Sequence, residues 1–228
     1  MLDTAAVAHS LPFIPLMAEK PVKRVRRAAT TSATNDGRET LTQEVWIQCA
    51  QEMLVDGGID LVRVDVMAKT LKVTRGSFYW HFRDRGDLLA HVLESWRNAA
   101  TEQIIERFDR LRDEPRGLVK ELLSLPFRGR AAHRAARVEL AIRDWARRDP
   151  MARNAVDDVD ARRISYISQC FSALGFDIVE ARSRAFVLYA YEVAESLLFN
   201  QGTASQKTQR SALVGELLLT RLAGASSG

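Results

Sequence analysis

One longer helical pattern followed by two short ones, with a tight break before each, constrains the fold of this 228-residue chain most strongly. From Thr40 apolar residues recur about every 3.6 positions, and Gly57-Gly58 ends the pattern with residues that readily adopt positive φ. The next apolar pattern runs only from Val64 to Leu71, and Thr74 can cap a third short helix reaching about Tyr79. Two short helices joined by a turn of about four residues are the outline of a helix-turn-helix.

The composition favours helix and excludes several other classes. Ala, Arg and Leu are the most frequent residues, whereas there are only 12 Gly and 6 Pro. With 46% hydrophobic residues and nearly balanced charge, disorder throughout the chain is excluded. Cys49 and Cys170 form neither a disulfide framework nor a metal-binding spacing, and no run approaches the roughly 20 apolar residues of a membrane span.

The residues around the third short helix resemble a known family. Val73 to Phe82 reads VTRGSFYWHF, and Arg83 to Leu89 reads RDRGDLL. This resembles the TetR (tetracycline-repressor) family, whose recognition helix ends in Leu/Phe-Tyr-x-His-Phe. In that family a basic residue and an acidic-Leu-Leu opening of a long fourth helix follow. The resemblance spans residues 38 to about 97 and implies an all-α protein with an N-terminal helix-turn-helix DNA-binding domain and a helical ligand-binding and dimerisation domain.

We therefore expect three parts: a disordered basic tail over 1–38, a DNA-binding domain over 39–97 with its helix-turn-helix at about 63–82, and a helical domain over 98–228. The tail is either solvated and free or a basic arm that adds DNA contacts. Several helix ends are also predicted. Thr40 and Gln43 have capping-box spacing, Pro115 opens a helix that Pro126 ends, Asp149-Pro150 separates two more, and Gly175 closes the second of these.

The recognition helix combines short side chains with one long donor. Thr74, Gly76 and Ser77 allow a helix N-terminus to approach a phosphate or base edge. Arg75 is the best candidate for a bidentate guanine contact. By resemblance, Tyr79 touches phosphate and Arg85 takes the place of a lysine that binds the DNA backbone; Trp80 could equally pack in a core. The expected DNA contacts are Arg63, Lys72, Thr74, Arg75, Gly76, Ser77, Tyr79, Trp80, His81 and Arg85.

Three positions depart from the family pattern. Arg63 stands where Ser or Thr usually caps the second helix, and Arg cannot cap. Lys72 stands where the turn commonly has Gly, so the backbone there must tolerate a side chain. Gly86 weakens the start of the fourth helix by about 1 kcal/mol relative to Ala.

The distribution of charge along the chain is more informative about a DNA-binding surface than the total charge. The total is +4, yet residues 39–96 carry six basic and nine acidic residues. Within them, residues 63–85 carry six basic and two acidic residues, a net +4 over the predicted helix-turn-helix. DNA affinity that depends on these few charges should fall steeply with salt.

The C-terminal part contains helical patterns at about 88–108, 131–148, 151–174, 178–200 and 206–222. In the second of these, Ala135, Val138, Ile142 and Trp145 are expected to face the core. The last two have broad apolar stripes, which favour either a partner helix or an internal core. Resemblance implies a homodimer through the last two helices; the expected interface residues are Phe186, Tyr189, Val193, Leu197, Leu213 and Leu217.

Resemblance also implies a small-molecule pocket among the central helices. The more ordinary alternative for each candidate is a side chain packed in a helical core, and His133 with Arg143 or Glu139 could supply a polar anchor. The aromatic content of the set favours an apolar or aromatic effector. The candidate pocket residues are Trp96, Phe108, Phe127, Trp145, Met151, Tyr166, Cys170 and Phe171.

These observations predict a cytoplasmic, sequence-specific DNA-binding regulator, a ligand-responsive repressor acting as a homodimer on a palindromic operator. The alternatives are an activator of the same fold and a helical interaction protein that has lost operator binding. No nucleophile elbow, phosphate-binding glycine loop or H-E-x-x-H motif is present, so we expect no enzyme, no cofactor, no metal and no membrane partner.

Overall fold

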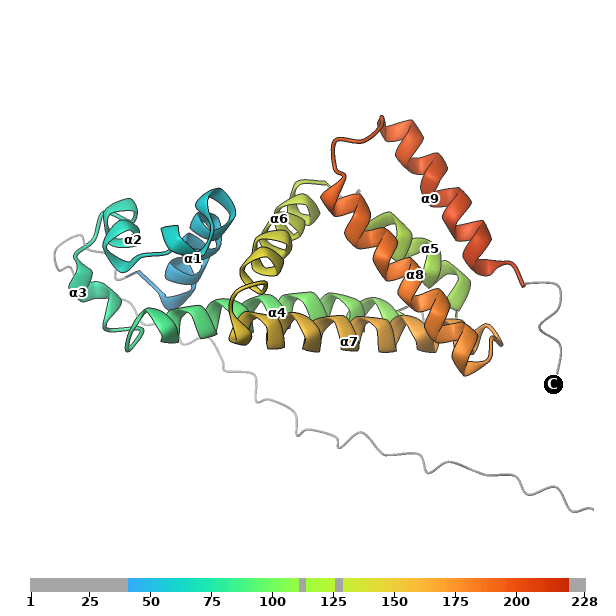
Figure 1. The fold of residues 1–228 in the computed structure, drawn as a ribbon, viewed down its shortest axis with the longest axis horizontal. Coiled ribbons are helices and arrows are strands. Elements are labelled where there is room, and N and C mark those ends of the chain that lie inside the picture. The colour runs from blue at the N-terminus through green and yellow to red at the C-terminus, as the bar shows by residue number, and fades with distance from the viewer. Residues whose placement is uncertain (1–40, 111–113, 126–128, 222–228) are drawn as a thin grey trace, which may run out of the picture. The chain divides into compact units, whose positions relative to one another are not determined.

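The computed structural model describes residues 41–110, 114–125 and 129–221, which form helices and contain no strand (Figure 1). The all-α prediction is confirmed. No helix in this part of the chain is long and apolar enough to cross a bilayer. The basic tail predicted over 1–38 lies outside the described residues. The helices are α1 (Gln43–Gly57), η1 (Ile59–Leu61, a 3₁₀-helix), α2 (Val64–Thr70), α3 (Arg75–Phe78), α4 (Arg85–Arg110), α5 (Pro115–Ser124), α6 (Gly129–Trp145), α7 (Pro150–Ala173), α8 (Ile178–Leu197) and α9 (Ala204–Leu219).

Most predicted helix ends are confirmed. Gly58 ends α1 with φ 74°, and Pro115 opens α5 at its first position. Asp149 caps α7 by accepting a hydrogen bond from the amide of Ala152 at 3.0 Å. Gly175, with φ 84°, follows α7. These ends were predictable because Pro, Gly and Asp act through their own backbone or nearest amides.

The predicted start of α1 was wrong. The helix begins at Gln43 rather than directly after Thr40, and Thr42 precedes it in an extended conformation without a side-chain capping bond. Leu41, just ahead of Thr42, packs against the core that contains Trp46. This is the spacing of a hydrophobic staple, in which an apolar residue before the cap fixes where the helix begins.

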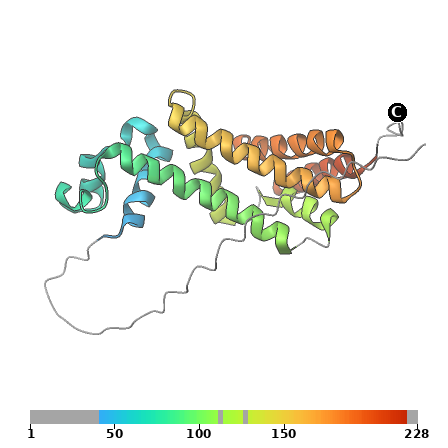
Figure 2. The same ribbon diagram turned by 90° about the horizontal axis from the view of Figure 1, so that it is seen from below.

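Among the described residues, buried apolar side chains form two clusters. The first joins α1, α2, α3 and α4 with the C-terminal half of α6 and the start of α7, and its largest fully buried side chains include Trp46, Phe78 and Phe82. The second joins α5, the C-terminal half of α7, α8 and α9. Helix α7 therefore contributes to both clusters, and it packs along α4, as Figures 1 and 2 show.

The first cluster continues through the predicted domain boundary near residue 97. That boundary falls inside α4, an unbroken helix, and Trp96 and Ala100 belong to the same cluster as Val138 and Ile142 of α6. The division into domains at this point remains a prediction. Within α6, Val138, Ile142 and Trp145 are buried as expected, whereas the prediction for Ala135 was wrong because that residue is exposed beside a hollow described below.

Candidate functional site

The turn between α2 and α3 has the strained residue that the sequence implied. Lys72 has φ 56°, in the left-handed region that Gly adopts without cost. The turn is closed by the amide of Val73, which donates to the carbonyl of Ala68 at 2.9 Å. Lys72 therefore occupies a position that costs backbone energy and leaves its side chain exposed.

Helix α3 is fixed by one buried ring. Phe78 has no exposed surface; its ring lies 5.4 Å from that of Trp46, nearly edge-on, and 5.2 Å from that of Phe82. Phe78 faces inward, whereas the first two residues of this short helix are exposed. Thr74, Arg75 and Gly76 are exposed. The structure thus places the three predicted N-terminal contact residues together on one accessible surface.

The two aromatic residues after Phe78 also face outward. Tyr79 is 56% exposed, and its ring lies edge-on to Phe78 at 5.3 Å. Trp80 is 88% exposed, which resolves its alternative placement in a core. An indole so accessible on a basic surface is unusual for a residue with only a packing role. Ser77 and His81 are half-buried.

Arg85 is engaged within the chain. Its Nε donates to the carbonyl of Val62 at 2.6 Å, and its Nη2 donates to the carbonyl of Ile59 at 2.6 Å. The side chain is half-buried and connects the start of α4 to η1 and to Val62, the residue that follows η1. Sequence reasoning had assigned this charge to the DNA backbone, but these two donors hold protein carbonyls in place.

A reciprocal cap compensates for Gly86 at the start of α4. The Asp84 carboxylate accepts from the amide of Asp87 at 2.8 Å, while the Asp87 carboxylate accepts from the amide of Arg83 at 2.9 Å. The hydrogen bond from the Arg83 backbone, followed by that from its side chain, lowers the pKa of Asp87. Sequence reasoning missed this cap, although the spacing Asp84-x-x-Asp87 was its signal.

Only some of the local basic residues are free of acidic partners. Arg63 precedes α2 without capping it and pairs with Asp65 at 3.2 Å. Arg83 pairs with Asp87 at 3.3 Å. Within the part of the chain that the structure describes, no ion pair involves Lys69, Lys72 or Arg75. These three charges remain available to an anion.

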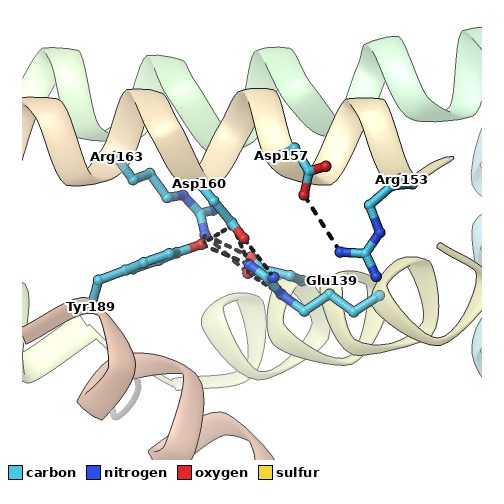
Figure 3. A network of polar contacts seen from close by, with 7 residues as sticks. Glu139, Arg153, Asp157, Asp160, Arg163 and Tyr189 are labelled. Carbon is cyan, nitrogen blue, oxygen red and sulfur yellow. Dashed lines mark hydrogen bonds and ion pairs between the residues drawn. The ribbon is translucent and has the colours of Figure 1, made fainter. Parts of the chain in front are cut away.

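A second polar cluster lies among α6, α7 and α8 (Figure 3). The Glu139 carboxylate accepts from both Arg143 and Arg163, with the closest contact to each at 2.9 Å. Arg143 also reaches Asp160 at 2.6 Å, and the hydroxyl of Tyr189 donates to Asp160 at 2.6 Å. Burial alone would lower the pKa of Arg143, but Asp160 and Glu139 outweigh it and raise that pKa.

This cluster changes two expectations. The sequence predicts Tyr189 on the dimer surface, yet this residue is only 6% exposed. Its hydroxyl is held by Asp160, Arg143 and Arg163. The sequence suggests a polar anchor formed by His133 with Arg143 or Glu139, but the ring of His133 lies 4.1 Å from that of Phe199. Neither placement could be derived from helical spacing alone, because partners on distant helices decide it.

A hollow of about 370 Å³ lies among α1, α4, α6 and α7. Trp96 alone of the predicted pocket residues with described side chains lines it. Trp145 is buried in the first cluster, and Cys170 and Phe171 are buried in the second. Met151 is exposed and Tyr166 half-buried; Phe127 and the side chain of Phe108 lie outside the described residues. The residues lining the hollow are Gln48, Gln51, Ser95, Trp96, Ala99, Ala100, Ala131, Arg134, Ala135, Val138, Glu139 and Arg163.

Helices α8 and α9 expose large apolar side chains. Phe186 is 61% exposed, Leu197 66%, and Leu217 65%. Leu213 is also exposed, whereas Val193 is half-buried against the second cluster. Four of the six predicted interface residues are therefore exposed, whereas Val193 is half-buried and Tyr189 is buried.

Comparison with known proteins matches residues 47–92 to the family model described as bacterial regulatory proteins of the tetR family. The chain is 27% identical over 82 residues to the HTH-type transcriptional regulator AcrR of Shigella flexneri; the match covers 36% of this chain and 38% of AcrR. The fold is similar to a TetR-family regulator from Rhodococcus sp. (TM-score 0.61, 18% identity, 78% of this chain and 98% of that one). It is also similar to a regulator from Saccharomonospora viridis crystallised with choline (TM-score 0.62, 17% identity, 77% and 94%).

The matched residues begin inside α1 and end inside α4, so they include the whole of α2, the strained turn and α3. The similarity in fold extends well beyond them, over more than three quarters of the chain. Residues 47–92 therefore match the tetR family of bacterial regulatory proteins, and the chain is similar in fold to a TetR-family regulator over 78% of its length.

Proposed function

We propose that this regulator binds a palindromic operator as a homodimer and represses transcription until a small effector releases it. One observation carries the DNA contact: Phe78 anchors α3 from inside while Arg75, Tyr79 and Trp80 project outward. A side of a helix with an unpaired arginine and polar aromatic tips suits base edges and phosphates. Repression itself is carried over from the family.

In this proposal the candidate contacts have different roles. Arg75 reads a base, whereas Lys72, Thr74, Gly76, Ser77, Tyr79, Trp80 and His81 approach the backbone or groove wall. Arg63 can contribute when it exchanges Asp65 for a phosphate. Arg85 acts by positioning α4 against η1 through the carbonyls that it binds.

The exposed apolar surface of α8 and α9 supports the proposed dimer. Phe186, Leu197, Leu213 and Leu217 are each more than half exposed, and burying such a side chain contributes roughly 1.5–3 kcal/mol. A two-fold dimer would present two α3 helices to successive major grooves of a palindrome. Effector binding and operator binding must then weaken each other reciprocally.

Capture of genomic DNA fragments by the full-length protein, followed by gel-shift titration, tests the proposal. We expect a palindromic motif among the fragments and affinity that falls steeply with salt. The double variant R75A/Y79A should lose the motif. Arg147→Ala is the matched control, because Arg147 is exposed and pairs with Asp144, outside the helix-turn-helix. A protein that captures no motif would instead be the interaction protein that sequence reasoning left open; a motif whose occupation raises transcription would make it an activator.

A further inference from the structure

The hollow among α1, α4, α6 and α7 lies against the helix-turn-helix body itself. Gln48 and Gln51 of α1 form one side of it, and Trp96 of α4 and Val138 of α6 form others. The same α1 carries Trp46, which packs against Phe78 of the recognition helix. A molecule in this hollow would therefore contact the helix that supports α3.

The lining favours a flat apolar body of limited size. Trp96, of which 5% is exposed, forms part of the wall, and Ala99, Ala100, Ala131 and Ala135 are small enough to leave space beside it. A volume of about 370 Å³ is at the lower end of small-molecule sites, enough for two fused rings.

The charged end of the hollow favours an anion over a cation. Both oxygens of Glu139 are occupied by Arg143 and Arg163, so no free carboxylate is left for a cationic ligand. The Nε of Arg163 is buried and has no hydrogen-bond partner among the described residues. A buried donor without a partner costs free energy that an incoming acceptor can recover.

A second arginine at the hollow also ties two helices together. Arg134 of α6 lines the hollow, and its Nη2 donates to Glu52 of α1 at 2.8 Å. One turn further along, Arg137 pairs with Asp56 of α1 at 3.4 Å but does not line the hollow. An anion in the hollow would compete with Glu52 for Arg134 and leave the Arg137 pair untouched.

We propose that this hollow binds an organic anion with an aromatic body, and that the anion draws Arg134 away from Glu52 and so loosens α1 from α6. This inference rests on the proposed function: it names the chemical class of the effector and the first structural change that the effector causes. The anion's ring lies on Trp96, and its carboxylate or similar group lies between Arg134 and Arg163.

Calorimetry on the full-length protein without DNA tests the ligand class. The probes are 1-naphthoate, the neutral 1-naphthylmethanol and the cationic 1-naphthylmethylammonium, which share one ring system. We expect the neutral compound to bind about tenfold more weakly than naphthoate and the cation more weakly still. Equal binding of all three, or none by naphthoate, would overturn the proposal.

Two variant pairs locate the site and its coupling. Ala135→Trp should fill the hollow and abolish naphthoate binding, whereas Ala161→Trp, at an exposed position on α7, should not. Arg134→Gln should weaken naphthoate binding about tenfold, and Arg137→Gln less than about twofold. Unchanged binding in A135W or R134Q would place naphthoate elsewhere and overturn the proposal.

Operator titration with and without naphthoate tests the release step separately. Naphthoate should weaken operator binding by the wild type and lose that effect in R134Q. If naphthoate binds as expected and the protein captures no operator, the proposed function fails while the ligand site stands. If the operator is bound and naphthoate binds without weakening it, the release step fails.

Discussion

Helix α3 and the α8–α9 pair expose opposite kinds of side chain, although both lie next to a tightly buried cluster. Around α3 the buried ring is Phe78, and the exposed residues are short, basic or polar-tipped. On α8 and α9 the exposed residues include Phe186, Leu213 and Leu217. Water solvates the short and charged side chains of the first surface well, whereas the apolar side chains of the second favour a covering partner. The polar, basic surface around α3 is suited to DNA phosphates, and the apolar surface of α8 and α9 is suited to a second apolar protein surface.

The largest expected effect tests the anchor beneath the polar surface. Phe78→Ala should lower the free energy of unfolding by about 3–5 kcal/mol, because it leaves a cavity between Trp46 and Phe82. Trp80→Ala is the control and should change stability by less than about 0.5 kcal/mol, because the ring is 88% exposed. Urea denaturation measures both; equal losses would show that α3 is not held by Phe78.

The next effect tests the apolar surface. Leu217→Asp should weaken self-association by about 2 kcal/mol or more, roughly thirtyfold, by placing a charge in the expected interface. Val179→Asp is the control, since Val179 is 72% exposed on α8 but outside the predicted interface. Sedimentation velocity over a concentration series distinguishes them. A wild-type monomer at every concentration would refute the dimer.

A smaller effect concerns the cap that supports the polar surface. Asp84→Ala should cost about 1 kcal/mol of stability by removing the acceptor for the Asp87 amide, whereas Asp60→Ala, in η1, should be nearly neutral. The lowered pKa of Asp87 adds a pH dependence. Its contribution is present above the ordinary pKa of about 3.9 and is lost as the pH falls through the lower folded value. Asp87→Asn should remove that component from the acid limb of a stability–pH curve.

The smallest effect on stability is expected in the turn between α2 and α3. Glycine should stabilise the protein at Lys72 and destabilise it at Lys69. Lys72→Gly should raise stability by about 0.5–1 kcal/mol because φ is 56° there. Lys69→Gly, inside α2, should lower it by about 1 kcal/mol. Thermal unfolding of the two variants measures the difference. Destabilisation by both would contradict the strain at Lys72.

The same contrast explains how far sequence could predict this molecule. The breaks at Gly58, Pro115 and Pro150 follow from the local sequence pattern, and the structure confirms them. Even Lys72 could be identified as strained, because a glycine was expected in that turn.

The remaining errors share a physical cause. Arg85, Tyr189 and Ala135 were misplaced or given a different role because their surroundings come from other helices: carbonyls near η1, the Asp160 cluster on α7, and the hollow beside α1. Helical spacing states which residues share a side of one helix but not what that side meets. The predicted pocket residues do not lie together for the same reason. They were chosen by residue type on different helices, and only Trp96 of those described lines the hollow.

Competition binding over a salt series tests the proposal that α3 reads DNA through Arg75. We expect Arg75→Ala to lower the preference for the captured motif over a scrambled duplex by about 1–3 kcal/mol while leaving the salt dependence nearly unchanged. Lys72→Gly should instead weaken both duplexes alike and reduce the slope of log affinity against log salt by about 1 per subunit. An unchanged preference in R75A, with the protein folded, would contradict the assignment of α3 as the reading helix.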